Sequence, residues 1–311
     1  MNNFLKRQIA NIICGFLPPI LAQRIRAIIY SENDGIFESA NFRKKSITGS
    51  IFSGNTADIH AYTFSVNGFY DWRNVAIARS VCRNGDEIIE IGANIGTETI
   101  CFSDIIGKQG KIFAFEPLES NVYSLHENIR INSKKNIEIF PVAISNIEGN
   151  IAFAPPINYH MSGTGSLDPS GKRQGKTIDV ICWTLDSHLE LYKNLRCMFI
   201  DIEGADYLAI LGGHQTIRRF RPVIVMESSP NLMKRYGYSQ EDVIETMDSL
   251  GYHCYTISKI SLSRVLCNGK KNNWVCIPKE KMRLRHRINL FIIIYALLPN
   301  VFLRLLVKKN A

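Results

Sequence analysis

The residue types best suited to ligand chemistry begin at Glu90, in the run Glu-Ile-Gly-Ala-Asn-Ile-Gly-Thr that contains Gly92, Asn94 and Gly96. The run follows a short apolar segment and precedes one with helical spacing. Glycines at the carboxyl end of a strand let the backbone approach a ligand closely. Pyrophosphate-binding loops have G-x-G-x-x-G instead. An acid just before this G-x-x-x-G suits a ligand with a cationic amino-acid end; a packing turn that binds nothing is the alternative.

A second carboxylate, Glu116, ends the next apolar segment, 24 residues after Gly92. Near this spacing an acidic residue binds ribose hydroxyls in nucleotide-binding folds, because its two oxygens can accept from both hydroxyls of a vicinal diol. The glycine loop and Glu116 together predict a nucleoside-cofactor site. S-adenosylmethionine combines a ribose with a cationic amino-acid end, so it is the expected cofactor.

A third group of acids, Asp201 and Glu203, lies at the end of a predicted strand at 197–202. Ligands bind at the carboxyl ends of the strands in parallel sheets, so both residues are candidate catalytic groups. Glu227, which ends the strand predicted at 222–226, would point into the same region. The alternative is a solvent-exposed strand end with hydrated acids.

Strand and helix patterns alternate around these residues. Further strands are predicted at 87–91, 111–115 and 137–142, and helices at 97–106, 120–131, 205–219 and 240–250. This alternation predicts an α/β protein with a mostly parallel sheet and helices on both faces. Segments 252–257 and 274–277 have no crossover helix between them, so they should form an antiparallel hairpin at the sheet edge. Segment 154–177 is a long loop rich in Gly, Ser and Pro, and such loops are often functional.

The charge is distributed unevenly along the 311 residues. The formal net charge of +9 divides into +4 over residues 1–30, −4 over 31–269 and +9 over 270–311. An acidic centre argues against a nucleic-acid partner. The eight scattered cysteines fit a reduced, cytoplasmic protein. We expect an N-terminal helical extension at 1–35, a cofactor-binding domain at 36–280 and a C-terminal extension at 281–311.

Both ends of the chain combine apolar runs with basic residues. The N-terminal run is interrupted by Pro18 and Pro19 and lacks a small-residue cleavage site, which argues against a secretory signal. The uninterrupted apolar run at 288–298 is shorter than the ~20 residues of a spanning helix. The pattern predicts a peripheral site on the cytoplasmic face of a membrane. Packing on the core or in a homodimer is the alternative.

Residues 84–153 and 184–229 resemble the FkbM family of S-adenosylmethionine-dependent methyltransferases. The resemblance is carried by the following stretches: Asn84-Gly-Asp, the 90–96 loop, Ala114-Phe-Glu-Pro, Val142-Ala-Ile-Ser, Thr184-Leu-Asp, Ile200-Asp-Ile-Glu-Gly-Ala and Arg221-Pro-Val-Ile-Val-Met-Glu. It implies the class I methyltransferase (Rossmann-like) fold with a seven-stranded sheet, and O-methylation of sugar or polyketide hydroxyls. By position, Glu90 and residues 92–96 would flank the methionine part, Glu116 the ribose, and Val142 and Ala143 the adenine. Phe199 stands where the family often has Lys.

Methylation of a hydroxyl requires a base, and an ordinary carboxylate with a pKa of about 4 is a weak one. A divalent metal held by Asp201, Glu203 and Glu227 could acidify the hydroxyl, although no metal site is favoured. Alternatively, His160 in the long loop could act as the base. The acceptor would be a small molecule or a glycan. A lipid-linked acceptor would suit an enzyme located at a membrane. An NAD(P)-dependent oxidoreductase and a catalytically silent membrane-associated scaffold are the rival interpretations.

Overall fold

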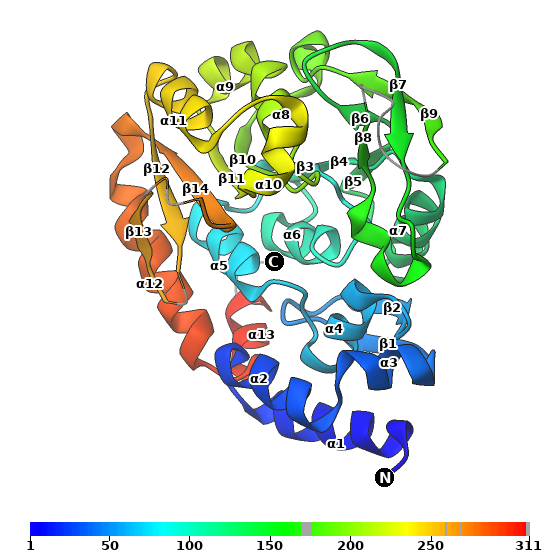
Figure 1. Cartoon of the computed structure of the whole chain (residues 1–311). Helices are drawn as coiled ribbons and strands as arrows, with labels where there is room; N and C mark the ends of the chain where they lie inside the picture. Colours follow the sequence, from blue (N-terminus) through cyan, green and yellow to red (C-terminus); the bar gives the residue numbers. More distant parts are fainter. Residues whose placement is uncertain (169–175, 259, 266, 268, 309–311) are drawn as a thin grey trace.

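The structure is a computed structural model that describes residues 1–168, 176–258, 260–265, 267 and 269–308. Its centre is an eight-stranded sheet in the order β13-β12-β14-β11-β10-β3-β4-β5 (Figure 1). Strands β11, β10, β3, β4 and β5 are parallel, and β14 is antiparallel to both β11 and β12. The strands are β3 (Glu87–Ile91), β4 (Lys111–Phe115), β5 (Ile137–Phe140), β10 (Leu195–Ile200), β11 (Val223–Ser228), β12 (Tyr252–Ile257), β13 (Leu262–Arg264) and β14 (Asn272–Pro278).

This sheet confirms the predicted α/β class, the mostly parallel strands and the antiparallel hairpin. Two details differ from the expectation. Strand β14 inserts between β11 and β12, so the later strand of the hairpin lies inside the sheet. The short β13, which the sequence did not predict, pairs with β12 and adds an eighth strand. Three residues are too few to show a recognisable alternation.

The chain changes direction across the sheet at β3, which lies between β4 and β10. A crevice opens at the carboxyl ends of the strands at such a switch point. In the register, Glu90 of β3 lies opposite Ala114 of β4 on one side and Phe199 of β10 on the other. The loops that follow these three strands are therefore neighbours.

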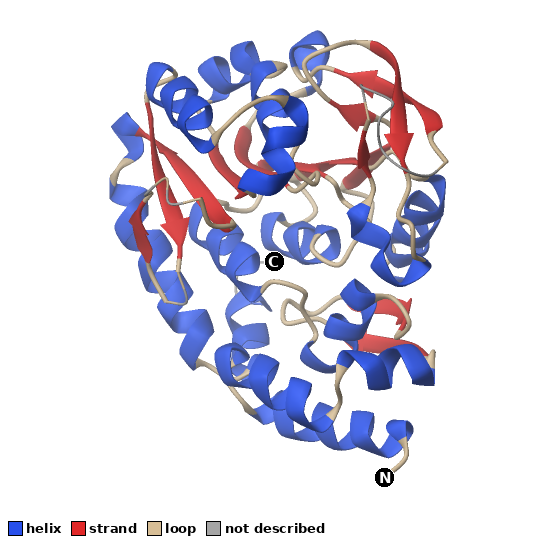
Figure 2. Ribbon diagram, viewed as in Figure 1, coloured by secondary structure: helices blue, strands red, loops and turns tan. Residues whose placement is uncertain are grey.

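Helices cover both faces of the sheet (Figure 2). Adjacent residues of β3 point to opposite layers. Ile88 packs in the core that contains residues of α5, α6 and α12, and Ile89 packs in the core that contains residues of α8, α9 and α11. The helices of this part are α5 (Trp72–Val81), α6 (Thr99–Ile106), α7 (Glu119–Ile131), α8 (Asp206–Leu211), α9 (His214–Phe220), α10 (Pro230–Met233), α11 (Gln240–Ser249) and α12 (Arg283–Leu297), with 3-10 turns η2 (Asp186–Leu191), η3 (Lys234–Tyr236) and η4 (Lys279–Lys281).

The helix predicted at 205–219 is divided in two. It breaks at Gly212 and Gly213, between α8 and α9. A Cβ at Gly212 would lie 2.0 Å from the carbonyl oxygen of Ser145, so only glycine permits this contact. Close packing against a distant loop therefore sets the helix end.

A second, four-stranded sheet in the order β6-β9-β7-β8 follows β5. It contains β6 (Ala143–Ile144), β7 (Gly149–Ala154), β8 (Ser166–Leu167) and β9 (Ile178–Trp183). Strand β5 ends at Phe140, two residues earlier than predicted, and Ala143 and Ile144 form the next strand, which pairs with β9. The predicted loop at 154–177 includes the 3-10 segment η1 (Tyr159–Thr164) and β8, and its residues 169–175 lie outside the described part.

Both terminal extensions are helical, as predicted. The N-terminal part contains α1 (Asn3–Phe16), α2 (Pro19–Ile29) and α3 (Glu32–Glu38), followed by the hairpin β1 (Asn41–Lys45) and β2 (Ile51–Asn55) and by α4 (Ile59–Asn67); the C-terminus ends with α13 (Asn300–Lys308). Their inner sides pack on the chain itself. Ala10 of α1 and Tyr30 cluster with Tyr62 of α4, and Ile292 of α12 packs with α5. No helix among the described residues combines the length and apolar character needed to cross a membrane. The boundaries predicted after residues 35 and 280 stay predictions.

Candidate cofactor and acceptor site

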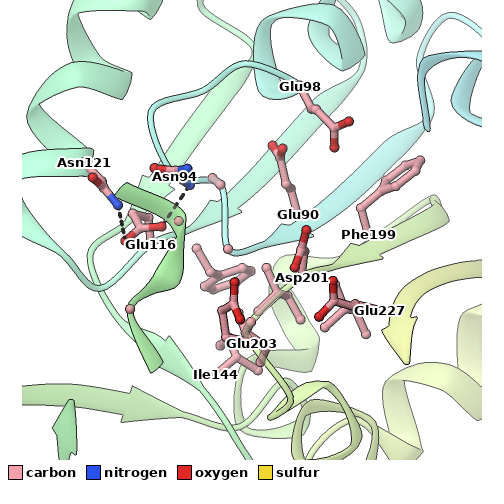
Figure 3. A pocket seen from close by; sticks show the side chains of 18 of the residues that line it. Glu90, Asn94, Glu98, Glu116, Asn121, Ile144, Phe199, Asp201, Glu203 and Glu227 are labelled. Carbon is pink, nitrogen blue, oxygen red and sulfur yellow. Dashed lines mark hydrogen bonds between the residues drawn. The ribbon is translucent and has the colours of Figure 1, made fainter. Parts of the chain in front are cut away.

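A pocket opens at the carboxyl ends of β3, β4, β10 and β11 (Figure 3). Of the candidate residues, those that line it are Glu90, Gly92, Asn94, Glu116, Ala143, Asp201 and Glu203. Gly96 is not among the lining residues; it packs against Leu125 below the loop. The fold thus places Glu90 and Glu203, which are 113 residues apart in the sequence, in one pocket.

Gly92 permits the close approach of two loops. Its φ is +86°, and a Cβ there would lie 2.1 Å from the carbonyl oxygen of Asp201. The backbone N–H groups of Gly92 and Asp201 donate to the carbonyls of Phe115 and Ile91, at 2.9 and 3.0 Å. The first glycine of the motif therefore brings the cofactor loop against the loop of the candidate catalytic acids.

Glu116 is held by three hydrogen bonds. Its Oε2 accepts from the backbone N–H of Asn94 at 2.9 Å, and its Oε1 accepts from the backbone N–H of Leu118 at 3.0 Å and from Asn121 Nδ2 at 3.3 Å (Figure 3). Burial raises the pKa of Glu116 to about 7, and these hydrogen bonds oppose the rise. Oε1 already accepts two hydrogen bonds, whereas Oε2 accepts one and retains acceptor capacity for a ligand hydroxyl.

Glu90 is buried without a compensating charge. Its Oε2 has no hydrogen-bond partner in the described part of the chain, and burial raises its pKa to about 8. It is directed toward Glu98, whose pKa is also raised, by burial and by the Asp71 and Glu90 charges (Figure 3). The buried Asn94 Oδ1 likewise lacks a partner among the described residues. Unsatisfied buried acceptors are costly, so this corner fits a cationic ligand that supplies hydrogen-bond donors.

The acids that follow β10 and the acid near the end of β11 form the other side of the pocket. Asp201 lies between Glu90 and Glu227 in Figure 3. The Asp201 carboxylate is exposed to the pocket, and desolvation by the surrounding protein, followed by the Glu227 and Glu203 charges, raises its pKa to about 7. Lys271 Nζ pairs with Glu227 Oε1 at 2.5 Å. Among the described residues, no three His, Cys, Asp or Glu side chains are grouped so that they could hold a metal ion.

Two residues that no motif indicated, His60 and Tyr70, also line the pocket. Their ring centroids are 4.4 Å apart, and burial lowers the pKa of His60, so its imidazole is neutral at neutral pH. A Cβ at Gly163 of η1 would lie 2.5 Å from His60 Cε1, so the loop backbone packs directly on this ring. No feature of the sequence around His60 or Tyr70 indicates that they lie over the distant strand ends.

His160 lies away from the pocket, whereas Phe199 lines it. The ring Nδ1 of His160 lies 2.8 Å from the carbonyl oxygen of Ala57, and His160 is not among the residues that line the pocket. Phe199, where the family often has Lys, lines the pocket and stacks on Phe102 with centroids 4.2 Å apart. An apolar contact therefore occupies the position where the resemblance implied a charge.

A family model described as the methyltransferase FkbM domain matches residues 90–254, which is more than half of the chain. The chain belongs to the FkbM methyltransferase family. It is therefore an S-adenosylmethionine-dependent methyltransferase with a class I fold, and not an NAD(P)-dependent oxidoreductase. No curated protein sequence matches it.

Several solved structures are similar to this FkbM methyltransferase. The methyltransferase FkbM of Methylobacillus flagellatus is 12% identical with a TM-score of 0.40, covering 71% of this chain and 53% of that chain. Fibrillarin of Aeropyrum pernix, in complex with S-adenosyl-L-methionine, is 14% identical with a TM-score of 0.37, covering 63% and 67%. Precorrin-6y C5,15-methyltransferase of Geobacter metallireducens is 11% identical with a TM-score of 0.37, covering 66% and 85%.

Proposed function

We propose that this methyltransferase methylates a hydroxyl group of a sugar, glycan or related natural product, and that Asp201 accepts the hydroxyl proton. The supporting observation is a carboxylate that is exposed at the edge of the pocket and whose pKa is raised to about 7 by the surrounding protein and by the Glu227 and Glu203 charges. A base is most effective when its pKa is close to the working pH. The carboxylate pKa of about 4 that makes an ordinary aspartate a weak base does not apply at this position.

The residues of the pocket fit S-adenosylmethionine in two places. Glu90, with its unpartnered oxygen, suits the cationic methionine end, and Glu116, anchored by Asn94 and Asn121, suits the ribose hydroxyls. Ala143, on the loop that follows β5, would flank the adenine. When bound, the cofactor supplies an electrophilic methyl group on its sulfonium. The remaining tasks, orienting the acceptor and removing its proton, belong to the chain.

Asp201 is better placed for proton removal than the other candidates. It lies beside Gly92, so it is adjacent to the proposed methionine site but belongs to a different loop. His160 is not among the pocket residues, and His60 is packed under Gly163. Glu227 Oε1 is already paired with Lys271 Nζ.

The rest of the lining suits a hydroxylated acceptor. Carboxylates, the amides of Asn74 and Asn273, and the ammonium of Lys271 all reach the pocket. These groups can accept from and donate to several hydroxyls of one polyol. Glu203, with its left-handed backbone at φ +54°, is proposed to bind the acceptor beside Asp201.

The test is a methyl-transfer screen with labelled S-adenosylmethionine against free sugars, glycans and lipid-linked sugars. With the acceptor found, Asp201→Asn should abolish most turnover while leaving S-adenosylhomocysteine affinity within a few-fold. The wild-type kcat should rise with pH and level off above about 7, since Asp201 must be ionised to accept a proton. Asp179→Asn, at an exposed position of β9, is the matched control.

Full turnover in Asp201→Asn would remove Asp201 as the base. Loss of S-adenosylhomocysteine binding in a folded Asp201→Asn variant would instead assign this carboxylate to the cofactor. Methyl transfer to an amine or carbon acceptor, with none to hydroxyls, would contradict the O-methylation proposal. The absence of transfer to any acceptor, together with no binding of S-adenosylhomocysteine, would favour the silent scaffold.

A further inference from the structure

The outward side of α1 is apolar although its inward side is already packed. Ala10 and Cys14 are fully buried against the chain, whereas Leu5, Ile12 and Phe16 on the opposite side are 47%, 64% and 72% exposed. A surface helix of a globular protein normally turns polar residues outward. The exposed row therefore requires a partner other than the chain's own core.

Helix α12 has the same organisation. Its inward side buries Ile288, Ile292 and Tyr295. Its outward side carries three exposed apolar residues: Leu290, Ile293 and Leu297. The exposed apolar surface continues along α13 with Val301, Phe302 and Leu305.

The four terminal helices adjoin one another. Helix α1 packs on α2 and α13, and α2 packs on α12, along one side of the molecule (Figure 1). Helix α2 adds Ile28, which is 79% exposed. We call this surface the terminal-helix face, represented by Leu5, Ile12 and Phe16 of α1 and Leu290, Ile293 and Leu297 of α12.

The same four helices carry the whole net charge of the protein. They contain nine Lys or Arg and no Asp or Glu, while the rest of the chain contains 28 of each sign. Lys6 and Arg7 pair with acids of α3. Arg24, Arg283 and Arg287 belong to none of the ion pairs formed within the described residues. The exposed apolar rows are thus accompanied by uncompensated positive charge.

We propose that the terminal-helix face docks the protein on an anionic lipid bilayer, with the apolar rows in the interfacial region and the arginines against the headgroups. Apolar side chains beside basic ones match both layers of such a surface. A second copy of the chain is a poorer occupant. A two-fold interface would place this basic surface against itself, and like charges repel. The anionic cytoplasmic leaflet is the matching membrane surface.

Flotation of the full chain tests this proposal without using methyl transfer. The vesicles are phosphatidylcholine alone, or phosphatidylcholine with phosphatidylglycerol. The wild type should float with the anionic vesicles, less with the neutral ones, and less as salt rises. Combined Leu290→Gln, Ile293→Gln and Leu297→Gln should abolish flotation. Combined Ile157→Gln and Ile181→Gln, at exposed apolar positions outside the face, should not change it.

A charge variant tests the electrostatic part separately. Arg24→Gln, Arg283→Gln and Arg287→Gln together should weaken binding to anionic vesicles about a hundredfold, roughly fivefold for each residue. If the apolar variant fails to fold, this second variant decides. Thermal unfolding and S-adenosylhomocysteine binding should match the wild type in both, since none of the six positions lines the pocket.

Wild-type protein that stays in the soluble fraction with anionic vesicles would overturn the proposal. So would flotation that neither variant reduces. A concentration-dependent dimer that the Leu290/Ile293/Leu297 variant dissociates, without flotation of the wild type, would make the face an interface between two copies instead.

Discussion

Replacing Glu90 by Gln should stabilise the cofactor-free protein at neutral pH and weaken its affinity for the cofactor. Burial raises the pKa of Glu90 from 4.5 to about 8, and its Oε2 has no partner among the described residues. In the unfolded chain the carboxyl ionises above 4.5, whereas the folded protein retains the proton until about pH 8. The folded state therefore loses about 1.4 kcal/mol of stability for each pH unit between these values.

The penalty at pH 7 is thus about 3 kcal/mol, and the neutral amide of Glu90→Gln removes it. Below pH 4.5 the two proteins should be equally stable with respect to this group, and above pH 8 the difference should level off. Urea unfolding without cofactor at pH 5, 7 and 8.5 measures it. Glu245→Gln, at an exposed position of α11, is the control and should show no comparable gain.

The same variant should bind S-adenosylhomocysteine about 1.5–3 kcal/mol more weakly by calorimetry, the range for a hydrogen bond to a charged group. Binding to the wild type below pH 8 should release a proton, because Glu90 must ionise to pair with the ammonium group. A Glu90→Gln protein less stable than the wild type at pH 7, or a stability difference that does not vary with pH, would refute the reasoning about burial. Unchanged affinity would place Glu90 outside the cofactor site.

Two further substitutions probe the site. Glu116→Ala should weaken S-adenosylhomocysteine binding by about 1–3 kcal/mol in calorimetry, because it leaves the Asn94 N–H unpaired and removes the ribose acceptor; unchanged affinity would exclude a ribose contact. Gly92→Ala should destabilise the protein by several kcal/mol in urea unfolding, because the new Cβ would lie 2.1 Å from the Asp201 carbonyl oxygen and φ is +86°. The control is Gly15→Ala in α1, where no atom lies within 4 Å of the added Cβ. This control should stabilise the protein by roughly 0.5–1 kcal/mol. Equal effects of the two alanines would show that the β3 and β10 loops do not require this contact.

Local sequence patterns were sufficient to predict the parts of the site that lie on or directly after regular strands. Strands β3, β4 and β12 have the predicted ends, because each is a short apolar run bounded by turn residues. Glu90, Gly92 and Glu116 could be chosen because their spacing along one strand–helix–strand unit determines their spatial relation. Parallel pairing of β3 with β4 then places both loops at the same edge of the sheet.

Only the tertiary structure decided what covers these residues and how they ionise. His60 and Tyr70 reach the pocket from α4 and the segment that follows it, and the sequence contains no period or motif that relates this part to β10. The raised pKa of Asp201 depends on desolvation by the surrounding protein and on Glu227, which lies near the end of a different strand. The outward apolar rows of α1 and α12 could be recognised only once Ala10 and Ile292 were seen to pack inward. Burial and charge proximity sum over segments far apart in the chain, and for that reason spacing along the sequence predicts the ligand-binding loops but not their electrostatic environment.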